Sequence, residues 1–477
     1  MSFWTPRSLR DVTSGRYLPS PDTSPSHRDL QGLSTDTRSL IPGQVFLALR
    51  GDNFDGHDFL EAAAEAGAGL LMIDRPEAAA ALADRCDVLV VNDTLKALTQ
   101  MATAYRRGLT GRVIAITGSA GKTTTKHLIQ TILSRHHRGS ASPRSFNNHI
   151  GVPLTLLQAQ RGDAYTVVEV GTNAPGEIAA LAKIVQPDVA VITHVGAAHL
   201  EGLGSLDAIL REKASLLNHL QPDGLAIVNG DIAGLHPYRK IVRATLSFGT
   251  APGCDLRLTD YQPDATACTF EVNDRTRYRL PMLGRHNAMN ALAAIAVARH
   301  MQLSEAQIAE ALAEAPPADM RLEVRTVGRG DRAITLINDA YNANPDSVAA
   351  ALGVLADYPA TGRRVAVLGD MLELGDEAAA RHRQVGEQVL AAKLDLAVFA
   401  GPLMMFAAEA VNRTLPSDRV LALPDWGEPG TLEKVAALLQ PGDTVLLKGS
   451  RGMRMERLIQ TLEHRLSSDR EPDALSR

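Results

Sequence analysis

A glycine loop between an apolar run and a helical segment holds the residues of this sequence most able to do chemistry. The stretch from Val113 to Lys126 reads Val-Ile-Ala-Ile-Thr-Gly-Ser-Ala-Gly-Lys-Thr-Thr-Thr-Lys. Gly118 and Gly121 let backbone N–H groups turn inward around phosphate oxygens. Lys122 supplies a mobile positive charge to the β- and γ-phosphates, and the Thr123 hydroxyl can ligate Mg²⁺. The segment is therefore predicted to be a phosphate-binding loop.

The loop departs from the usual spacing in one place. The common pattern has a glycine five residues before Gly121, but Ile116 stands there, so the loop is a shortened variant. A glycine-rich turn by itself is more often structural. Here an apolar strand, the loop, a Gly-Lys-Thr sequence and a helix follow in register, and this combination favours nucleotide binding.

A carboxylate inside an apolar strand is the second candidate group. Thr166-Val-Val-Glu-Val-Gly171 places Glu169 close to the carboxyl end of a predicted strand, where an unpaired charge is expensive to bury. A cation is therefore expected beside it. Mg²⁺ held by nucleotide phosphates fits, because magnesium prefers one or two carboxylates plus phosphate oxygens. A salt bridge to a neighbouring helix is the structural alternative.

A lysine interrupts an apolar helical stripe farther along the chain. Leucine and isoleucine recur at helical spacing from Leu206 to Leu220, and Lys213 lies in the middle of that stripe. It stands four residues after Ile209 and four before Leu217, so its side chain is expected to point inward. A lysine can also extend its ammonium group out of such a position. Together with the neighbouring motifs, the pattern favours a functional lysine.

Histidines and asparagines near these motifs have both functional and structural interpretations. The segment from His194 to His199 follows a predicted strand, and either histidine is a candidate metal ligand or a hydrogen-bonded structural group. Asn287 and Asn290 lie near the start of an alanine-rich helix, one turn apart, which suits amide contacts to a base or to a facing loop. A helix N-terminal cap is the alternative role for these asparagines.

Three loops in the last third of the chain place polar groups directly after apolar runs. They are Ile337 to Pro345, Leu368 to Gly375 and Leu447 to Arg451. One such loop is ordinary. Three of them together predict a second ligand-binding face.

Composition excludes several classes of protein. The chain has 477 residues, 45% of them hydrophobic and 22% charged, which is typical of a soluble globular protein. A formal net charge of −5 provides no field for nucleic acid, which is not expected as a partner. No apolar run approaches the ~20 residues needed to cross a bilayer, and no signal-peptide region is evident. Cys86, Cys254 and Cys268 lack metal-type spacing and are expected to be reduced, so a cytoplasmic location is predicted.

The organisation of the chain indicates three α/β domains. A basic linker near Tyr105 to Arg112 and the tandem prolines Pro316 and Pro317 mark the boundaries, which gives domains at 1–107, 108–317 and 318–477. Continuous apolar runs in the middle domain predict strands covered on both faces, hence a doubly wound parallel sheet carrying the phosphate-binding loop. A small N-terminal α/β domain and a C-terminal Rossmann-like α/β domain are expected to flank it. Ligands then belong at the carboxyl ends of the strands.

These motifs resemble those of the Mur ligases, ATP-dependent amide-forming enzymes of peptidoglycan synthesis. The matching segments occur in the family's order and span nearly the whole chain, and the shortened phosphate loop is also the family's pattern. The segments are Ser34 to Gly43 with Gly56-His57, Thr117 to Thr124, Asn147 to Pro153, Ala198 to Gly202, His286-Asn287, Asp339 to Pro345 and Lys448 to Arg451.

Within the family, the chain is most similar to the members that join D-alanyl-D-alanine to UDP-N-acetylmuramoyl-tripeptide through an acyl phosphate. The resemblance implies the use of ATP and two Mg²⁺ ions. A monomer is expected, and the lack of a long apolar run predicts no insertion into a membrane. It also implies that the three domains bind the UDP-muramoyl peptide, ATP and the dipeptide, respectively. Another Mur-type ligase, such as the enzyme that adds the third amino acid, is the alternative. Asn147-Asn-His-Ile-Gly, Asn342-Ala-Asn-Pro and the lack of an Asp-Asn-Pro-Arg segment argue against that alternative.

The resemblance further implies residue roles that the sequence alone leaves open. Asn287 would contact the adenine, Arg321 the phosphates and Asp339 the ribose. Lys213 corresponds to a carbamylated lysine of the family. The nucleotide contacts implied are Gly118, Ser119, Ala120, Gly121, Lys122, Thr123, Thr124, Asn287, Arg321 and Asp339. The catalytic residues implied are Lys122, Glu169, His199 and Lys213. Thr123 and Glu169 would hold the first Mg²⁺, and Glu169, His199 and Lys213 would hold the second.

Substrate contacts are implied in the same way. The uridine diphosphate end would be held by Ser34, Thr35, Asp36, Thr37 and Arg38 with the region from Gly51 to His57. The muramoyl part would be held by Asn147 and Asn148. The dipeptide side would be formed by Tyr341, Asn342, Lys448 and Arg451.

Overall fold

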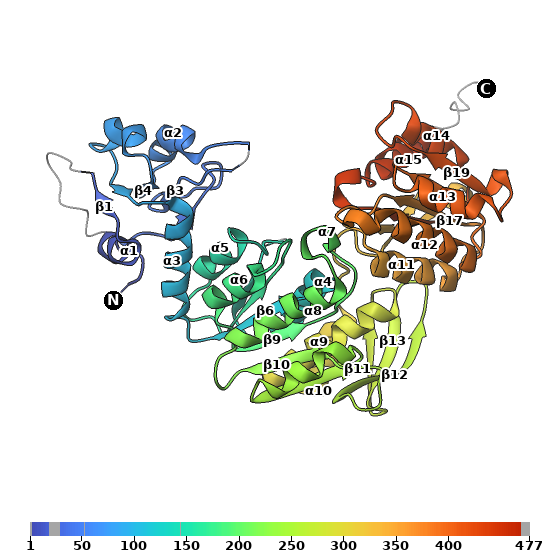
Figure 1. Ribbon diagram of the computed structural model, residues 1–477, viewed down its shortest axis with the longest axis horizontal. Helices are drawn as coiled ribbons and strands as arrows, with labels where there is room; N and C mark the ends of the chain where they lie inside the picture. The colour runs from blue at the N-terminus through green and yellow to red at the C-terminus, as the bar shows by residue number, and fades with distance from the viewer. Residues whose placement is uncertain (1, 19–28, 52, 144, 469–477) are drawn as a thin grey trace, which may run out of the picture.

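The computed structural model describes residues 2–18, 29–51, 53–143 and 145–468. Within these ranges the chain forms three sheets of five, nine and six strands, each covered by helices. Figure 1 shows them in succession, from the blue N-terminal part through the green central part to the orange and red C-terminal part. The predicted three-domain α/β architecture is therefore confirmed.

The N-terminal sheet has the strand order β1-β5-β4-β3-β2, and all its pairs are parallel except β1 with β5. Its strands are apolar and short, and helix α3 (Thr94–Arg106) leads from this sheet into the central one. The other elements are α1 (Pro6–Thr13), β1 (Arg16–Tyr17), β2 (Leu33–Ser34), β3 (Val45–Leu47), α2 (Leu60–Glu65), β4 (Leu70–Ile73) and β5 (Val88–Val90).

The central sheet has the order β14-β13-β12-β11-β10-β9-β6-β8-β7. Seven of its strands, from β12 to β7, are parallel, as the continuous apolar runs predict. The strands in chain order are β6 (Arg112–Thr117), β7 (Gly139–Ala141), β8 (Tyr165–Glu169), β9 (Val189–Ile192), β10 (Leu225–Asn229), β11 (Ala244–Gly249), β12 (Leu256–Pro263), β13 (Cys268–Val272) and β14 (Thr276–Leu280). The helices are α4 (Lys122–Leu133), α5 (Gly151–Gln158), α6 (Glu177–Val185), α7 (Leu200–Leu203), α8 (Leu206–Ala214), α9 (Arg285–His300) and α10 (Glu305–Ala313).

An antiparallel extension was not predicted. Strands β12, β13 and β14 pair antiparallel, and in β13 buried and partly exposed residues alternate from Cys268 to Val272. This alternation is typical of a sheet with one covered face. Helix α9 packs on that face and joins the same apolar core.

The C-terminal sheet has the order β15-β16-β20-β17-β18-β19 and is parallel apart from β15. Its strands are β15 (Glu323–Val327), β16 (Ile334–Asp339), β17 (Arg364–Gly369), β18 (Leu396–Ala400), β19 (Val420–Leu423) and β20 (Thr444–Lys448). Its helices are α11 (Pro345–Asp357), α12 (Ala378–Ala391), α13 (Met405–Asn412), α14 (Thr431–Leu438) and α15 (Arg457–Ser468).

The carboxyl ends of strands from two sheets meet at one place. In the central sheet β6 and β8 end at Thr117 and Glu169, and in the C-terminal sheet β16 and β20 end at Asp339 and Lys448. An apolar cluster with Leu200 from the central part and Leu374 from the C-terminal part joins the two. Ligand sites of α/β sheets lie at such strand ends. None of the helices in the described ranges is long and apolar enough to span a membrane.

Candidate active site

The phosphate-binding loop is built by close packing at its two glycines. Strand β6 ends at Thr117 and helix α4 begins at Lys122, as predicted. Gly121 has φ +82°, and a Cβ there would lie 2.3 Å from Asn290 Oδ1. A Cβ at Gly118 would lie 2.0 Å from Thr193 Oγ1. Both positions therefore require glycine, and the backbone between them can curve around an anion.

Residues directly after strand β9 hold the phosphate-binding loop in place. Thr193 Oγ1 donates to the carbonyl oxygen of Ala120 at 2.6 Å. The Ser119 hydroxyl donates to the carbonyl oxygen of Gly196 at 2.9 Å and accepts from its N–H at 3.0 Å. These contacts fix the loop without using its N–H groups as donors to side chains. The loop is therefore shaped before any ligand binds.

Lys122 lies within reach of the loop and of the buried carboxylate. Its Nζ donates to the carbonyl oxygen of Gly118 at 2.6 Å. Removal from water lowers the pKa of Lys122, while the charge of Glu169 raises it and that of Arg321 lowers it. The cations Lys122 and Arg321 and the carboxylate of Glu169 thus face the same space. The two cations can neutralise the charge of a polyanion bound there.

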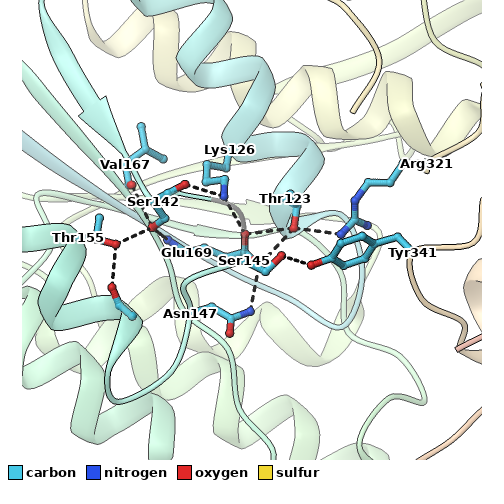
Figure 2. Close-up of polar contacts among 11 residues, drawn as sticks. Thr123, Lys126, Ser142, Ser145, Asn147, Thr155, Val167, Glu169, Arg321 and Tyr341 are labelled. Carbon is cyan, nitrogen blue, oxygen red and sulfur yellow. Dashed lines mark hydrogen bonds and ion pairs between the residues drawn. The ribbon is translucent and has the colours of Figure 1, made fainter. Parts of the chain in front are cut away.

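Glu169 is buried, with 1% of its surface exposed, and three side chains contact its carboxylate. Thr123 Oγ1 donates at 3.1 Å, Asn147 Nδ2 donates at 3.0 Å, and Lys126 Nζ lies 3.4 Å away (Figure 2). The salt bridge to a neighbouring helix, the structural alternative for Glu169, is therefore present. Because Lys126 comes from α4, one turn after Lys122, the strand and helix bring both lysines to one carboxylate.

The donor set at Glu169 also suits Mg²⁺. The Thr123 hydroxyl and the Glu169 carboxylate are hard oxygen ligands beside a loop that can hold phosphate oxygens, which is the environment that magnesium prefers. Among the described residues, no group of three or more histidine, cysteine, aspartate or glutamate side chains could hold a metal by itself. A metal at this position would therefore depend on the oxygens of a bound nucleotide as well.

The side chain of Arg321, from the C-terminal part, reaches Thr123 beside the phosphate-binding loop. Arg321 Nη2 donates to Thr123 Oγ1 at 3.1 Å, and its guanidinium lies 4.2 Å above the ring of Tyr341. The hydroxyl of Tyr341 hydrogen-bonds Ser145 Oγ at 2.5 Å (Figure 2). The stacked ring holds the planar guanidinium over the threonine that is expected to contact the metal.

A cavity of about 490 Å³ joins these groups. Both the central and the C-terminal parts of the chain line it. Fifteen of the predicted site residues are among its walls: Ser119, Ala120, Gly121, Lys122, Thr123, Thr124, Asn147, Glu169, His199, Asn287, Arg321, Asp339, Tyr341, Asn342 and Lys448. The structure therefore brings together most of the residues that the sequence motifs pointed to, from segments more than 300 positions apart.

The two asparagines of α9 lie in the wall of this cavity. Asn287 and Asn290 are buried, and Asn290 Nδ2 donates to Asn287 Oδ1 at 3.2 Å. Asn287 Nδ2 donates to the carbonyl oxygen of Leu283 at 2.8 Å. Gly284 occupies the cap position of α9 and no side chain caps the helix there. The capping alternative is therefore wrong, and the amides remain candidates for base contacts.

Asp339 and Lys448 form a buried ion pair at the ends of β16 and β20. Lys448 Nζ lies 2.6 Å from Asp339 Oδ2 and donates to the carbonyl oxygen of Asn342 at 3.0 Å. The resemblance implied different ligands for these two residues, the ribose and the dipeptide. The structure places both in one cavity, with the lysine charge balanced by the aspartate.

The two histidines face carboxylates of the C-terminal part. His199 Nδ1 lies 2.6 Å from Glu373 Oε2, and His194 Nε2 lies 3.2 Å from Asp346 Oδ2. His199 has φ +57° and is the residue directly before helix α7. Its role as a metal ligand stays a prediction, and its partner Glu373 was missed because the two are 174 residues apart.

Lys213 points into the protein as predicted, with 1% of its surface exposed. Burial first, and then the charge of Lys122, lowers the pKa of Lys213 to about 7. The predicted apolar stripe is wrong at one end, because Leu206 is 49% exposed. It lies in the first turn of α8, and the helix ends at Ala214 before a tighter turn from Ser215 to His219.

The N-terminal candidates lie apart from this cavity. None of the residues from Ser34 to Arg38 is among its described walls. Arg38 and Asp36 form an exposed ion pair at 2.6 Å, and the Arg38 hydrogen bond lowers the pKa of Asp36 to about 2. His57 is buried between Asp55 and Asp74. Their assignment to the uridine diphosphate end stays a prediction.

Asn148 has a structural role that the motif did not indicate. Its Oδ1 accepts the N–H groups of Ile150 at 3.2 Å and Gly151 at 2.9 Å, so it forms the turn that leads into α5. We expect Asn148→Ala to lower the free energy of unfolding by about 1 kcal/mol, because these hydrogen bonds are lost. Urea unfolding measures this, with Asn148→Asp as the matched control that retains the acceptor. Equal stability of all three proteins would contradict the structural role.

Three family models match the chain in the order that the motifs suggested. The model for "Mur ligase family, catalytic domain" matches residues 29–106, the "Mur ligase middle domain" matches residues 116–298, and "Mur ligase, glutamate ligase domain" matches residues 320–451. A curated relative from Bacillus subtilis, UDP-N-acetylmuramoyl-tripeptide–D-alanyl-D-alanine ligase, is 37% identical over 91% of this chain and 93% of its own length.

Solved structures agree with these matches. A crystal structure of MurF from Acinetobacter baumannii has a TM-score of 0.84 and 32% identity, and the match covers 97% of this chain and 99% of that one. MurF ligase from Thermotoga maritima in complex with ADP has a TM-score of 0.79 and 28% identity, with 92% and 99% covered. With this shared architecture and a relative that is 37% identical over 91% of this chain, the chain belongs to the Mur ligase family of ATP-dependent ligases.

Proposed function

We propose that this chain joins D-alanyl-D-alanine to UDP-N-acetylmuramoyl-tripeptide at the expense of ATP, giving the pentapeptide precursor of peptidoglycan, ADP and phosphate. The observation that carries the proposal is the convergence of the phosphate loop, Glu169 and Arg321 on one cavity between the central and C-terminal parts. The name of the curated relative and the ADP complex of the Thermotoga maritima protein support it. The curated relative from Bacillus subtilis and the two MurF structures are not named for the alternative, a ligase for the third amino acid.

The three domains would divide the substrates among them. Residues 1–107 would bind the UDP-muramoyl peptide, residues 108–317 ATP, and residues 318–477 the dipeptide. The nucleotide phosphates would lie on the loop from Gly118 to Thr124, and the adenine against Asn287. Asp339 would contact the ribose.

The first chemical step requires two anions to approach each other. The tripeptide carboxylate attacks the γ-phosphorus of ATP, an acyl phosphate forms, and ADP leaves. Lys122 and Arg321 lie on either side of Thr123 and offset the repulsion between the carboxylate and the triphosphate. Mg²⁺ held by Thr123 and Glu169 would supply further charge neutralisation at the phosphates.

The second step forms the amide. The dipeptide amine attacks the acyl carbon, the bond to the phosphate oxygen breaks, and the amine loses a proton as phosphate leaves. The cavity has walls from two domains, and these would shield the acyl phosphate from water, which would otherwise hydrolyse it. Ser145 and Tyr341 close one side of this space with a hydrogen bond between the domains.

Lys213 would act as an anion rather than as a cation. Its buried amine, with a pKa of about 7, can react with CO₂ to give a carbamate and a proton, and the carbamate oxygens with Glu169 and His199 would suit a second Mg²⁺. The support is the burial of Lys213 together with the low pKa that burial causes.

Phosphate release with each substrate omitted in turn tests the proposed reaction. We expect phosphate release only when ATP, UDP-N-acetylmuramoyl-tripeptide and D-alanyl-D-alanine are all present. The mass of the product should equal the sum of the UDP-tripeptide and the dipeptide less water. Tripeptides ending in diaminopimelate and in lysine are both supplied, because either can occupy the third position. Release that does not depend on the dipeptide would contradict the proposal, as would release that requires a free amino acid with a UDP-muramoyl dipeptide.

A further inference from the structure

A second, smaller cavity adjoins the nucleotide cavity. It has a volume of about 190 Å³ and lies between the phosphate loop and two loops of the C-terminal part. Ser119, Lys122 and His199 line both cavities, whereas Glu373 and Arg451 line only the smaller one. The two cavities therefore meet where phosphate transfer is proposed. An amine that attacks an acyl phosphate must approach from such a neighbouring space.

The walls of the small cavity carry charges of both signs. Glu373 follows β17 and offers a carboxylate, and Arg451 follows β20 and offers a half-exposed guanidinium whose Nη1 lies 3.1 Å from Glu456 Oε1. The rest of the lining includes the small or apolar side chains of Ala198, Ala343 and Leu374 and the polar side chains of Asn342 and Asn344. A short dipeptide with a free ammonium group, a free carboxylate and two methyl side chains matches this lining in charge and in size.

The contacts of Glu373 place its carboxylate at the end nearest the phosphates. Its Oε2 lies 2.6 Å from Nδ1 of His199, the residue shared with the nucleotide cavity. Oε1 makes no hydrogen bond to any residue in the described ranges. The side chain is 57% exposed, so this oxygen is accessible from the cavity. An ammonium group there would stand beside the proposed acyl phosphate.

The loop that carries Glu373 is held in an uncommon conformation. Glu373 has φ +64°, a left-handed conformation that is uncommon for a residue with a side chain. The N–H of Leu372 donates to Ser450 Oγ at 2.9 Å, and the N–H of Met371 donates to the buried His382 Nε2 at 3.0 Å. The N–H of Glu201 donates to the carbonyl oxygen of Glu373 at 3.2 Å. These bonds maintain the carboxylate in one position.

We propose that Glu373 binds the ammonium group of the incoming dipeptide and that Arg451 binds its carboxylate, an assignment that rests on the proposed ligase function. Two of the other residues implied for the dipeptide, Tyr341 and Lys448, line only the larger cavity. Glu373 and Arg451 give the small cavity one group of each charge for the two charged ends of the dipeptide.

Steady-state kinetics of charge-removing variants tests this assignment. Glu373→Gln keeps the shape of the side chain and an oxygen that accepts from His199. We expect it to raise KM for D-alanyl-D-alanine about 10- to 100-fold, since a charged hydrogen bond is lost, and to leave KM for ATP and for the UDP-tripeptide within about two-fold. Glu377→Gln is the matched control, because Glu377 lies on the same loop, is half-exposed, pairs with Arg381 and lines neither cavity.

The carboxylate end is tested with D-alanyl-D-alanine amide as a second substrate. The wild-type enzyme should use the free dipeptide with a KM at least about 10-fold lower than that of the amide, and Arg451→Ala should bring the two KM values to within about two-fold of each other. Arg413→Ala, which removes an exposed arginine directly after α13, serves as the control.

The outcomes separate this assignment from the reaction itself. If wild-type protein releases no phosphate in response to the dipeptide, the proposed function fails and the assignment falls with it. If wild type responds but Glu373→Gln leaves the dipeptide KM unchanged, the ammonium assignment is wrong. A fall in kcat at unchanged dipeptide KM would show that Glu373 acts only by positioning His199, and would also overturn it. An unchanged acid-to-amide ratio in Arg451→Ala would overturn the carboxylate assignment.

Discussion

Replacing Lys122 by alanine should lower turnover at least ~10²-fold while the fold stays intact. The variant loses the charge that faces the phosphates and the hydrogen bond from Lys122 to the Gly118 carbonyl oxygen, but the contacts of Thr193 and Ser119 still hold the backbone of the loop. Removal of one group that stabilises a transition state typically costs 10²- to 10³-fold in rate. Phosphate release at saturating concentrations of the three substrates measures kcat, and thermal unfolding verifies the fold.

Lys96→Ala is the matched control for this substitution. Lys96 is an exposed lysine on α3 of the N-terminal domain, far along the chain from the loop, and its loss should leave kcat unchanged within about two-fold. An activity of Lys122→Ala within a few-fold of wild type would remove the phosphate-loop assignment. Loss of activity together with a large drop in unfolding temperature would instead indicate that Lys122 supports the loop.

The architecture could be predicted from the sequence where local patterns decide it. The apolar runs that begin at Val113 and Thr166 identified β6 and β8 closely, because strands buried on both faces need little else to mark them. The pattern failed for β13, where buried and partly exposed residues alternate, and for β15, whose residues are mostly partly exposed. Such strands depend on their partners in the sheet, and these lie elsewhere in the chain.

The sequence predicted which residues form the site but not which of them contact one another. Glu169 was selected because a buried carboxylate needs a cation, yet the cation that the structure shows, Lys126, lies on a helix face that sequence spacing does not relate to β8. The pairs Arg321 with Thr123 and His199 with Glu373 join domains across 198 and 174 residues. Contacts of this kind follow from how the domains pack together, which a single sequence does not encode in its local pattern.

Lys213 shows how burial can be inferred without its chemical consequence. Its position between Ile209 and Leu217 predicted an inward side chain, and the structure confirms this. The helical stripe did not predict that α8 would end one residue later or that Leu206 would be exposed. The pKa of about 7 results first from burial and then from the positive charge of Lys122, which is brought near Lys213 only by the fold.

Replacing Lys213 by alanine should abolish ligation, with a loss of at least ~10²-fold, because the proposed carbamate would be an anionic ligand that alanine cannot form. Lys213→Arg should fail equally, since a guanidinium stays protonated and does not react with CO₂. Acetate or formate should partly restore Lys213→Ala by supplying a carboxylate in the vacated space, and should not restore Lys213→Arg. Lys183→Ala is the control, because Lys183 is an exposed lysine on the neighbouring helix α6.

The modification itself can be measured apart from activity. Only the neutral amine reacts with CO₂, and below its pKa of about 7 Lys213 is protonated, so incorporation of ¹³C-labelled CO₂ should rise between about pH 6 and pH 8. A ¹³C NMR carbamate signal should be present in wild-type protein and in Lys183→Ala, and absent from both Lys213 variants. An ordinary lysine, with a pKa of ~10.4, would show little incorporation over this range. Near-wild-type activity of Lys213→Ala without added carboxylate, or a wild-type enzyme that is active without the labelled signal, would exclude the carbamate from the reaction.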